Sequence, residues 1–239
     1  MAYAWNQRGT ALAGLGKYEE ALTSIDRALA IISNYTYAWS NRSVVLWFLG
    51  RYPDALSANK RAIDINPTFS LAWFNQGRIF STMGRFDEAL AAYDRALKTN
   101  SNLGDSPTLT DIWTNQSAVL WRLQRYRDAI AVADNAISIN PNFAQAWYNK
   151  SLALVSLKRY EEAITSYYKA ISISPNNADF WAGLGIAFSS LQRYPEALTA
   201  LQKALEINPN QPQALQNIEL VRQAWILDKE ERFRGRQAP

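Results

Sequence analysis

Tryptophan recurs along this chain at a nearly constant interval. Six of the tryptophans, which we call the reference tryptophans, are separated by 34, 34, 40, 34 and 34 residues. They are Trp5, Trp39, Trp73, Trp113, Trp147 and Trp181. A period of this length is typical of a protein built from stacked copies of one small unit, none of which buries its apolar face alone. The spacing therefore predicts six repeats, with six extra residues between the third and the fourth.

Two apolar faces follow each reference tryptophan. A small residue stands four positions after it and a large apolar residue seven positions after it, which is the spacing of one helical face. An aromatic residue 13 positions after it and alanines 16 and 23 positions after it mark a second helix. Between them, Gly16, Gly50 and Gly84 can adopt the left-handed conformation that ends a helix. Each repeat is therefore predicted to be a helical hairpin.

Proline closes most of the repeats, because it cannot continue a helix and restrains the residue before it. Ser33 and Ser101 replace this proline in two repeats. In the segment 101–109, SNLGDSPTL, Gly104 and Pro107 end regular structure, which predicts a mobile hinge between the first three and the last three repeats. The predicted repeats are 2–35, 36–69, 70–103, 110–143, 144–177 and 178–211, with an inserted loop at 104–109 and a C-terminal capping helix at 212–235.

These columns resemble the tetratricopeptide repeat family. Trp, Gly or Ser, Leu, an aromatic residue, two alanines and Pro stand at that family's spacing across residues 2–211. The resemblance implies an all-α fold, a right-handed α-solenoid superhelix of antiparallel helix hairpins with a concave groove. Six hairpins and the cap give thirteen helices and no sheet. The resemblance also implies a non-enzymatic scaffold for protein–protein interaction.

Composition restricts the chemistry further. The chain has no Cys and no His, which excludes disulfides, thiolate nucleophiles, imidazole bases and the usual zinc sites. The acidic pairs Glu19–Glu20 and Glu161–Glu162 fall at the start of predicted second helices, where they favour the helix dipole rather than catalysis. We therefore predict no catalytic residue, no metal site and no cofactor. No apolar run suggests a membrane span or signal peptide, so a cytoplasmic location is expected.

Asparagine is the recurring residue that packing of the hairpin does not explain. Two residues along a helix correspond to a rotation of about 200°, so the residue two after the tryptophan points away from the surface that the tryptophan buries. Residues two before, five after and nine after the tryptophan share this opposite face, which in the tetratricopeptide repeat superhelix lines the groove. The asparagines at this offset are Asn41, Asn75, Asn115 and Asn149, with Gln7 in the first repeat and Gly183 in the sixth.

An amide carries a donor and an acceptor, so each asparagine can bind the backbone of an extended or partly helical segment of a partner protein. Several tetratricopeptide repeat proteins hold extended peptides with asparagines at this place, and the resemblance implies the same role here. Alternatively, each asparagine bonds an adjacent helix and only orders the stack. The groove positions that vary between repeats are predicted to select the side chains of the partner: Val44, Trp47, Phe48, Phe74, Arg78, Trp121, Arg122, Tyr148 and Leu152.

Three alternatives remain open. Trp47 and Trp121 either anchor the partner or pack sideways against a neighbouring helix. A basic residue before the aromatic at every turn (Lys17 to Arg193) suits a nucleic-acid backbone or a solvated edge, and we favour the solvated edge. An exposed row on the cap, Leu220, Ala224 and Leu227, suits self-association or assembly of a larger protein.

Binding of chaperone tails is not expected, because only Asn41 matches the family's two-carboxylate clamp. Met1 directly precedes the first repeat, as expected for a fragment of a longer protein.

Overall fold

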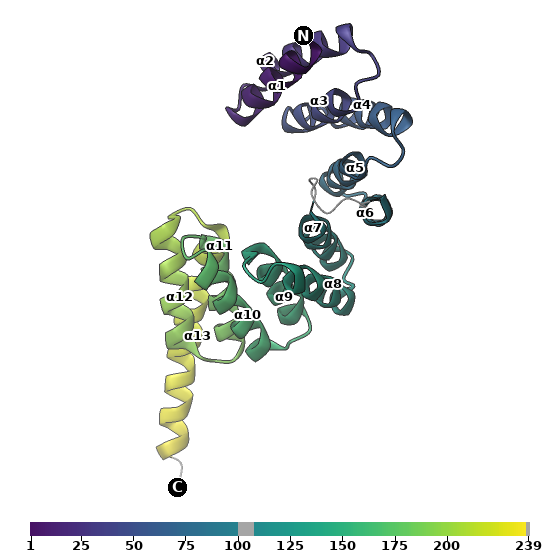
Figure 1. Ribbon diagram of the computed structural model, residues 1–239. Helices are drawn as coiled ribbons and strands as arrows, with labels where there is room; N and C mark the ends of the chain where they lie inside the picture. The colour runs from purple at the N-terminus through teal and green to yellow at the C-terminus, as the bar shows by residue number, and fades with distance from the viewer. Residues whose placement is uncertain (100–107, 238–239) are drawn as a thin grey trace. The chain divides into compact units, whose positions relative to one another are not determined.

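The computed structural model describes the backbone of residues 1–99 and 108–237. Across these residues the fold contains thirteen α-helices and no strand, which confirms the predicted fold class (Figure 1). The predicted hinge at 101–109 lies outside the described residues except for its last two positions. The helices are α1 (Ala2–Gly14), α2 (Tyr18–Ile31), α3 (Thr36–Phe48), α4 (Tyr52–Ile65), α5 (Ser70–Thr82), α6 (Phe86–Thr99), α7 (Leu109–Arg122), α8 (Tyr126–Ile139), α9 (Ala144–Ser156), α10 (Tyr160–Ile173), α11 (Ala178–Ser190), α12 (Tyr194–Ile207) and α13 (Pro212–Gln237).

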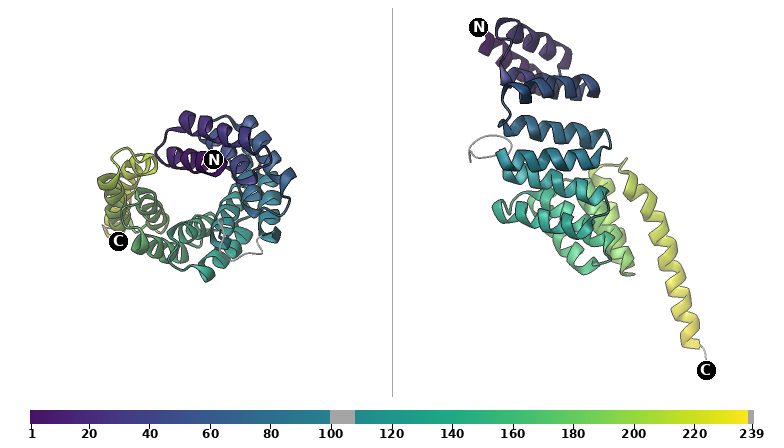
Figure 2. Two further views of the ribbon diagram at one scale, coloured as in Figure 1. Left: turned by 45° about the horizontal axis from the view of Figure 1, so that its top comes forward. Right: turned by 90° about the vertical axis from the view of Figure 1, so that its right-hand side faces the viewer.

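The chain divides into two compact units, Met1–Leu123 and Gln124–Pro239. We call them unit 1 and unit 2 and describe each by itself. Unit 1 contains α1 to α7. The pairs α1/α2, α3/α4 and α5/α6 form hairpins that stack in chain order, and α7 packs on α6 (Figure 2). Thr108 caps α7: its Oγ1 accepts from Asp111 N, while an Asp111 carboxylate oxygen accepts from Thr108 N.

Unit 2 contains α8 to α13. The pairs α9/α10 and α11/α12 form hairpins, α8 packs on α9, and α13 covers α11 and α12. Ala214 and Val221 of α13 are buried in the same core as the last hairpin. The C-terminal part of α13 extends beyond α11 and α12 (Figure 1). Helix α13 exposes Leu220 and Leu227, two residues of the surface predicted to mediate self-association, and that role stays a prediction.

The hairpins close because small residues on the first helix face large residues on the second. A Cβ added at Gly77 would overlap the Tyr93 ring, and one added at Gly185 would lie 2.7 Å from Leu201 Cγ. Distances below 3.0 Å are too short for real Cβ contacts, so the two helices approach this closely only with glycine there. In the second repeat, the column instead holds Ser43, whose Oγ donates to Asn59 Oδ1 at 3.3 Å.

Four of the reference tryptophans hold the connection between repeats. Their indole Nε1 donates to the backbone carbonyl oxygen of the residue six positions earlier, at 2.8 to 2.9 Å. These bonds join Trp39 to Ser33, Trp73 to Pro67, Trp147 to Pro141 and Trp181 to Pro175. Tryptophan therefore both fills the hairpin and fixes the turn that precedes it. The bond to Ser33 has the same length as the bonds to proline, so the missing closing proline does not alter this contact.

Candidate functional site

The sequence points to one face of the first helices, and unit 1 contains four of these helices. We call the A face of unit 1 the residues two before and two, five and nine after the reference tryptophans of α1, α3, α5 and α7. Three large aromatic side chains on it are open to solvent: Tyr3, Tyr37 and Phe48 are 64%, 51% and 48% exposed. Apolar rings at this level of exposure indicate a surface that can bind a partner.

Two asparagines of this face are joined to the preceding repeat. Asn41 Nδ2 donates to Asn6 Oδ1 at 3.0 Å and lies 3.3 Å from Thr10 Oγ1, both on α1. Asn75 Nδ2 donates to Ser40 Oγ on α3 at 3.0 Å. Asn75 is largely buried, and this bond holds its Nδ2 against α3 of the preceding hairpin. Rotation along a single helix could not reveal this burial, since the covering group belongs to another repeat.

The other two asparagines are bonded within their own helices. Asn115 Nδ2 donates to the carbonyl oxygen of Asp111 at 2.9 Å. In unit 2, Asn149 is buried and its Oδ1 accepts from Gln145 Nε2 at 3.0 Å. Within the described residues, the side-chain oxygens of Asn41, Asn75 and Asn115 accept no hydrogen bond. The three asparagines of unit 1 therefore differ from Asn149, whose side-chain oxygen already accepts a hydrogen bond.

Trp47 and Arg78 form one cluster between α3 and α5. Trp47 Nε1 donates to Thr82 Oγ1 at 2.9 Å, which ties the indole to the neighbouring first helix. The Arg78 guanidinium carbon lies 4.5 Å from the Trp47 ring centroid and 5.9 Å from that of Phe74. Phe74 itself is buried against the Tyr93 ring. Of the two roles proposed for Trp47, its contacts in this structure are those of sideways packing, and Phe74 lies mainly in the core.

Phe48 and Val44 lie on the exposed side of α3. The Phe48 ring stacks on Tyr18 with centroids 4.9 Å apart and an interplanar angle of 7°. Val44 is half-buried and lines a small internal space of about 10 Å³ together with Trp47 and Asn75. These side chains are held by their neighbours, so they offer apolar surface at little cost in side-chain entropy.

A row of aromatic rings runs along the start of the first helices, and the sequence pattern does not predict it as part of the site. The Tyr3 and Tyr35 rings meet edge to face with centroids 5.1 Å apart, and Tyr37 meets Phe69 in the same way at 4.8 Å. The Tyr35 and Tyr37 rings join these pairs at 6.4 Å. These residues stand two or four positions before a reference tryptophan, so the repeat pattern contains them, but the predicted site residues stand at other offsets.

The remaining predicted residues lie at the end of unit 1 or in unit 2. The Arg122 guanidinium lies 5.2 Å from the Trp121 ring centroid at the C-terminal end of α7. Tyr148 packs on Phe180 with centroids 5.0 Å apart, inside the core of unit 2. Leu152 is half-buried on α9. Ten of the thirteen predicted residues lie in unit 1: Asn41, Val44, Trp47, Phe48, Phe74, Asn75, Arg78, Asn115, Trp121 and Arg122.

Charge is distributed unevenly between the first and second helices of unit 1. Helices α1, α3 and α5 contain no Asp or Glu, and α7 contains Asp111 alone.

The basic residues at the turns are each paired with a carboxylate three positions later, from Lys17–Glu20 to Arg193–Glu196. This pairing favours the interpretation of the basic row as a solvated edge, because each positive charge already has a counter-charge.

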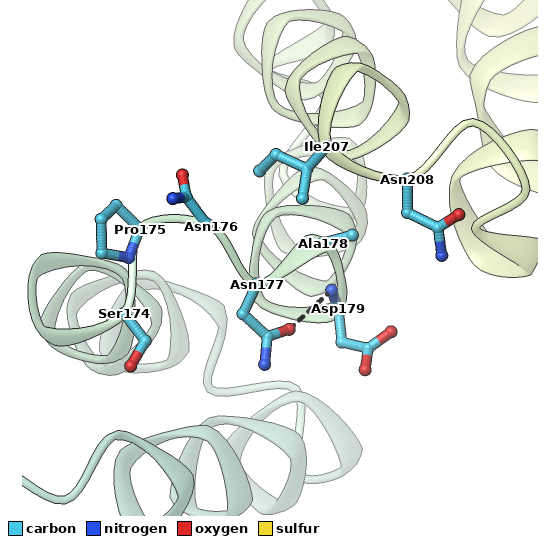
Figure 3. Close-up of a pocket in the computed structure, with 8 residues that line it drawn as sticks. All are labelled: Ser174, Pro175, Asn176, Asn177, Ala178, Asp179, Ile207 and Asn208. Atoms are coloured by element: carbon cyan, nitrogen blue, oxygen red, sulfur yellow. Dashed lines mark hydrogen bonds between the residues drawn. The ribbon is translucent and has the colours of Figure 1, made fainter.

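A depression in unit 2 is lined by polar groups that already form hydrogen bonds within the protein. It has a volume of about 600 Å³ and is lined by the loop before α11 and the end of α12 (Figure 3). Asn177 Oδ1 accepts from Asp179 N at 2.9 Å, and Asp179 Oδ1 accepts from Gln211 Nε2 at 3.0 Å. These groups begin α11 and fix the start of α13, so they are structural.

Neither a membrane helix nor a metal cluster is present in the parts of the chain described. No helix there has both the length and the apolar content needed to cross a bilayer. No group of three or more acidic side chains there is placed to hold a metal ion.

Models of the tetratricopeptide repeat family match the chain at residues 1–68, 70–103, 115–178 and 154–218. Together these ranges cover most of the sequence. The chain therefore belongs to the tetratricopeptide repeat family. No curated protein sequence matches it.

Solved structures confirm the fold at low sequence identity. YrrB, described as a TPR protein with an unusual peptide-binding site, is 19% identical with a TM-score of 0.61, and the match covers 82% of this chain and 97% of YrrB. PilW, a type IV pilus biogenesis factor, is 19% identical with a TM-score of 0.81, over 91% of this chain and 97% of PilW. The Cut9–Hcn1 hetero-tetramer of the APC/C gives 19% and 0.80, over 92% of this chain and 42% of the matched chain. Family membership supports a role as a protein–protein interaction scaffold.

Proposed function

We propose that unit 1 binds an extended segment of a partner protein along its A face. The observation that carries this proposal is the set of three amides, Asn41, Asn75 and Asn115, whose Nδ2 is held by the protein while Oδ1 accepts from no donor in the described part of the chain. A fixed amide with an open acceptor is suited to a backbone N–H, which every residue except proline provides. Recognition of this kind does not depend on side-chain identity.

The geometry of stacked helices suits such a segment. Neighbouring packed helices lie about 8–10 Å apart, and an extended strand rises about 3.3 Å per residue. Successive asparagines would therefore meet roughly every third residue of the segment. The bonds from Nδ2 fix each amide before binding, so little side-chain entropy remains to be lost. Because one N–H of each Nδ2 is already bonded within the protein, we assign each asparagine mainly an acceptor role toward the bound segment.

Selectivity is assigned to the exposed rings beside the amides. Tyr3, Tyr37 and Phe48 present large apolar surfaces, and aromatic residues are enriched among the side chains that dominate binding energy. Trp121 and Arg122 extend this surface on α7. The relative YrrB is described as having a peptide-binding site, which is consistent with a peptide as the ligand here. A cytoplasmic location stays a prediction from the sequence.

A selection experiment tests the proposal. The full chain is used to select binders from a phage-displayed library of random 12-residue peptides, and the affinity of one synthetic binder is then measured for variants. Replacing Asn41 and Asn115 together by Ala should weaken binding by about 1–3 kcal/mol, given about 0.5–1.5 kcal/mol per net hydrogen bond. Asn217→Ala is the matched control, because Asn217 makes the same bond to the carbonyl four residues earlier but lies on α13.

Aromatic truncation tests the selectivity. Tyr37→Ala should reduce the affinity and change which apolar residues are selected, whereas Tyr168→Ala in unit 2 removes an equally exposed ring and should change neither. A library that yields no binder, or a binder insensitive to the asparagine and tyrosine variants, contradicts the proposal.

A further inference from the structure

Arg78 differs from the other arginines of unit 1. Its guanidinium is half-buried between Trp47 and Phe74 and, among the described residues, meets no carboxylate within 4.0 Å and donates no hydrogen bond. Arg42, which is also half-buried, is paired with Asp26 at 2.8 Å. The other unit 1 arginines without a carboxylate partner are exposed, so water can solvate them: Arg8, Arg27, Arg61, Arg95 and Arg122.

Burial without a counter-charge is unfavourable for a cation. Partial burial lowers the pKa of Arg78 from the ordinary arginine value, and this effect exceeds the opposing influence of Tyr93 and Asp111. Asp111 Oδ2 is already used, since it accepts from Thr108 N at 3.0 Å and from Thr108 Oγ1 at 2.7 Å. The Trp47 ring contributes a cation–π contact, but it cannot accept the in-plane hydrogen bonds that a guanidinium donates. Among the residues that the structure describes, the donors of Arg78 therefore have no acceptor.

The surroundings of Arg78 favour an anion from outside the chain. The first helices α1, α3 and α5 have no carboxylate, so an incoming acid meets no like charge on them. Arg122 adds a second positive charge at the end of α7. A planar guanidinium held on an aromatic ring is also preorganised for the two parallel hydrogen bonds of a carboxylate.

We propose that Arg78 binds the carboxylate of an Asp or Glu side chain in the segment bound along the A face. This inference rests on the proposed function. Asn75 lies three residues before Arg78 on α5, and side chains at that spacing are neighbours on a helix. The acidic residue is therefore the one whose backbone N–H is bound by Asn75, or the residue next to it.

A peptide fits this site better than a nucleic acid. A nucleic-acid backbone needs a series of cations at phosphate spacing, whereas the A face of unit 1 has only Arg78 and Arg122. The basic row at the turns is paired with carboxylates of its own helices. One acidic side chain among apolar residues matches a surface with few charges and several exposed rings.

The test uses the full chain and the same random 12-residue library. Wild-type protein should select peptides that carry Asp or Glu at one fixed place, and Arg78→Gln should lose this preference while keeping the apolar positions. Arg95→Gln is the matched control, since it removes the same charge from an exposed site on α6. Changing Glu to Gln in a selected synthetic peptide should weaken binding to wild-type protein by roughly 10- to 100-fold, as expected for a hydrogen-bonded charge pair.

A double-mutant cycle connects the two partners. The same peptide change should have little effect on binding to Arg78→Gln, because the interaction is already absent. The melting temperature of Arg78→Gln should equal or exceed that of wild type, since an uncompensated, partly buried charge is removed. The Glu-to-Gln change in the peptide tests the inference even if this variant fails to fold.

The other outcomes separate the two proposals. Peptides selected for apolar residues without an acid overturn the inference about Arg78 and leave the proposed function standing. A library without binders contradicts both. Binding of a 12-nucleotide single-stranded oligouridylate that is tighter than any selected peptide and is lost in Arg78→Gln overturns the inference in favour of nucleic acid.

Discussion

The turns of the two units share a backbone conformation but not a residue type. Gly16, Gly50 and Gly84 in unit 1 have φ of 73° to 74°, while three non-glycine residues of unit 2 have φ of 58° to 60°. They are Gln124, Lys158 and Gln192. A left-handed conformation costs roughly 1–2 kcal/mol for an ordinary L-residue and almost nothing for glycine.

The hydrogen bonds of the turns explain why unit 2 accepts this strain. Lys17 N donates to Leu12 O at 2.9 Å in unit 1, and Arg159 N donates to Leu154 O at the same distance in unit 2. This bond closes the same helix-ending motif in both units. Packing of the two helices therefore imposes the turn, and glycine only lowers its cost. Differences between the units are thus best tested by exchanging residues at equivalent positions, with the largest effect expected in the core.

The largest effect is expected where glycine meets a ring. Gly77→Leu should destabilise unit 1 by about 1–3 kcal/mol or more, because the added side chain has no room beside Tyr93. The equivalent residue of unit 2 is Ser151, which already carries a Cβ, so Ser151→Ala should cost much less. Urea unfolding of both variants measures the difference. Wild-type stability of Gly77→Leu would show that the packing of this hairpin has been misassigned.

Restoring the asparagine column in the sixth repeat should also destabilise the chain. A Cβ at Gly183 would lie 2.5 Å from the Tyr167 hydroxyl oxygen, so Gly183→Asn should cost about 1–3 kcal/mol although Asn occupies this offset in four other repeats. Adding Tyr167→Ala should remove the clash, and the double variant should be more stable than the sum of the single effects predicts. Additive losses would exclude the clash as the cause.

Two asparagines of unit 1 should differ in their effect on folding. Asn75→Ala should lower the free energy of unfolding by about 1–2 kcal/mol, because it removes a buried bond and leaves Ser40 Oγ without its donor. Asn115→Ala should have almost no effect, since within the described residues the Asn115 side chain bonds its own helix and Ala is a better helix former. Equal losses in urea unfolding would contradict the assigned bonding.

Exchange at the turns should change stability in opposite directions. Gly50→Ala should cost about 1 kcal/mol, because no atom within 4 Å obstructs the Cβ and only the backbone conformation opposes it. Lys158→Gly should stabilise unit 2 by up to about 1 kcal/mol, since relief of the strain exceeds the added freedom of the unfolded chain. Lys158→Ala, which keeps the strain, serves as the control. A loss of stability in Lys158→Gly would show that the left-handed residue is not strained.

The smallest effect concerns the paired acids at the turns of both units. Hydrogen bonds from Arg85, Arg159 and Arg193 lower the pKa of Glu88, Glu162 and Glu196 below the ordinary value of 4.5. The folded pKa lies below the unfolded one, so these pairs stabilise the fold above about pH 4.5, and the contribution is lost as the pH falls through the folded pKa. The pairs are exposed, so salt should reduce the effect. In Arg85→Gln, the pKa of Glu88 measured by NMR should rise.

The residue pattern within one repeat predicts the fold, but it does not predict the contacts of the candidate site. Columns at fixed offsets from Trp39 or Trp73 report contacts inside one hairpin, and these were predicted because periodicity is a property of the chain itself. The burial of Asn75 and the sideways contact of Trp47 with Thr82 depend on the next hairpin in the stack. The same holds for the aromatic row from Tyr3 to Phe69, whose members come from two successive repeats.

The sequence alone determined the period, the two helices of each repeat and the absence of imidazole and thiol chemistry. Each of these follows from residue identity and spacing, since one repeat is a complete supersecondary unit. Only the tertiary structure decided which amide atoms of each asparagine are bonded within the protein, which half-buried arginine of unit 1 has no acceptor among the described residues, and which residues bear the strain of a turn. Those properties belong to pairs of side chains brought together by stacking, and no spacing along one chain specifies the partner that covers a surface.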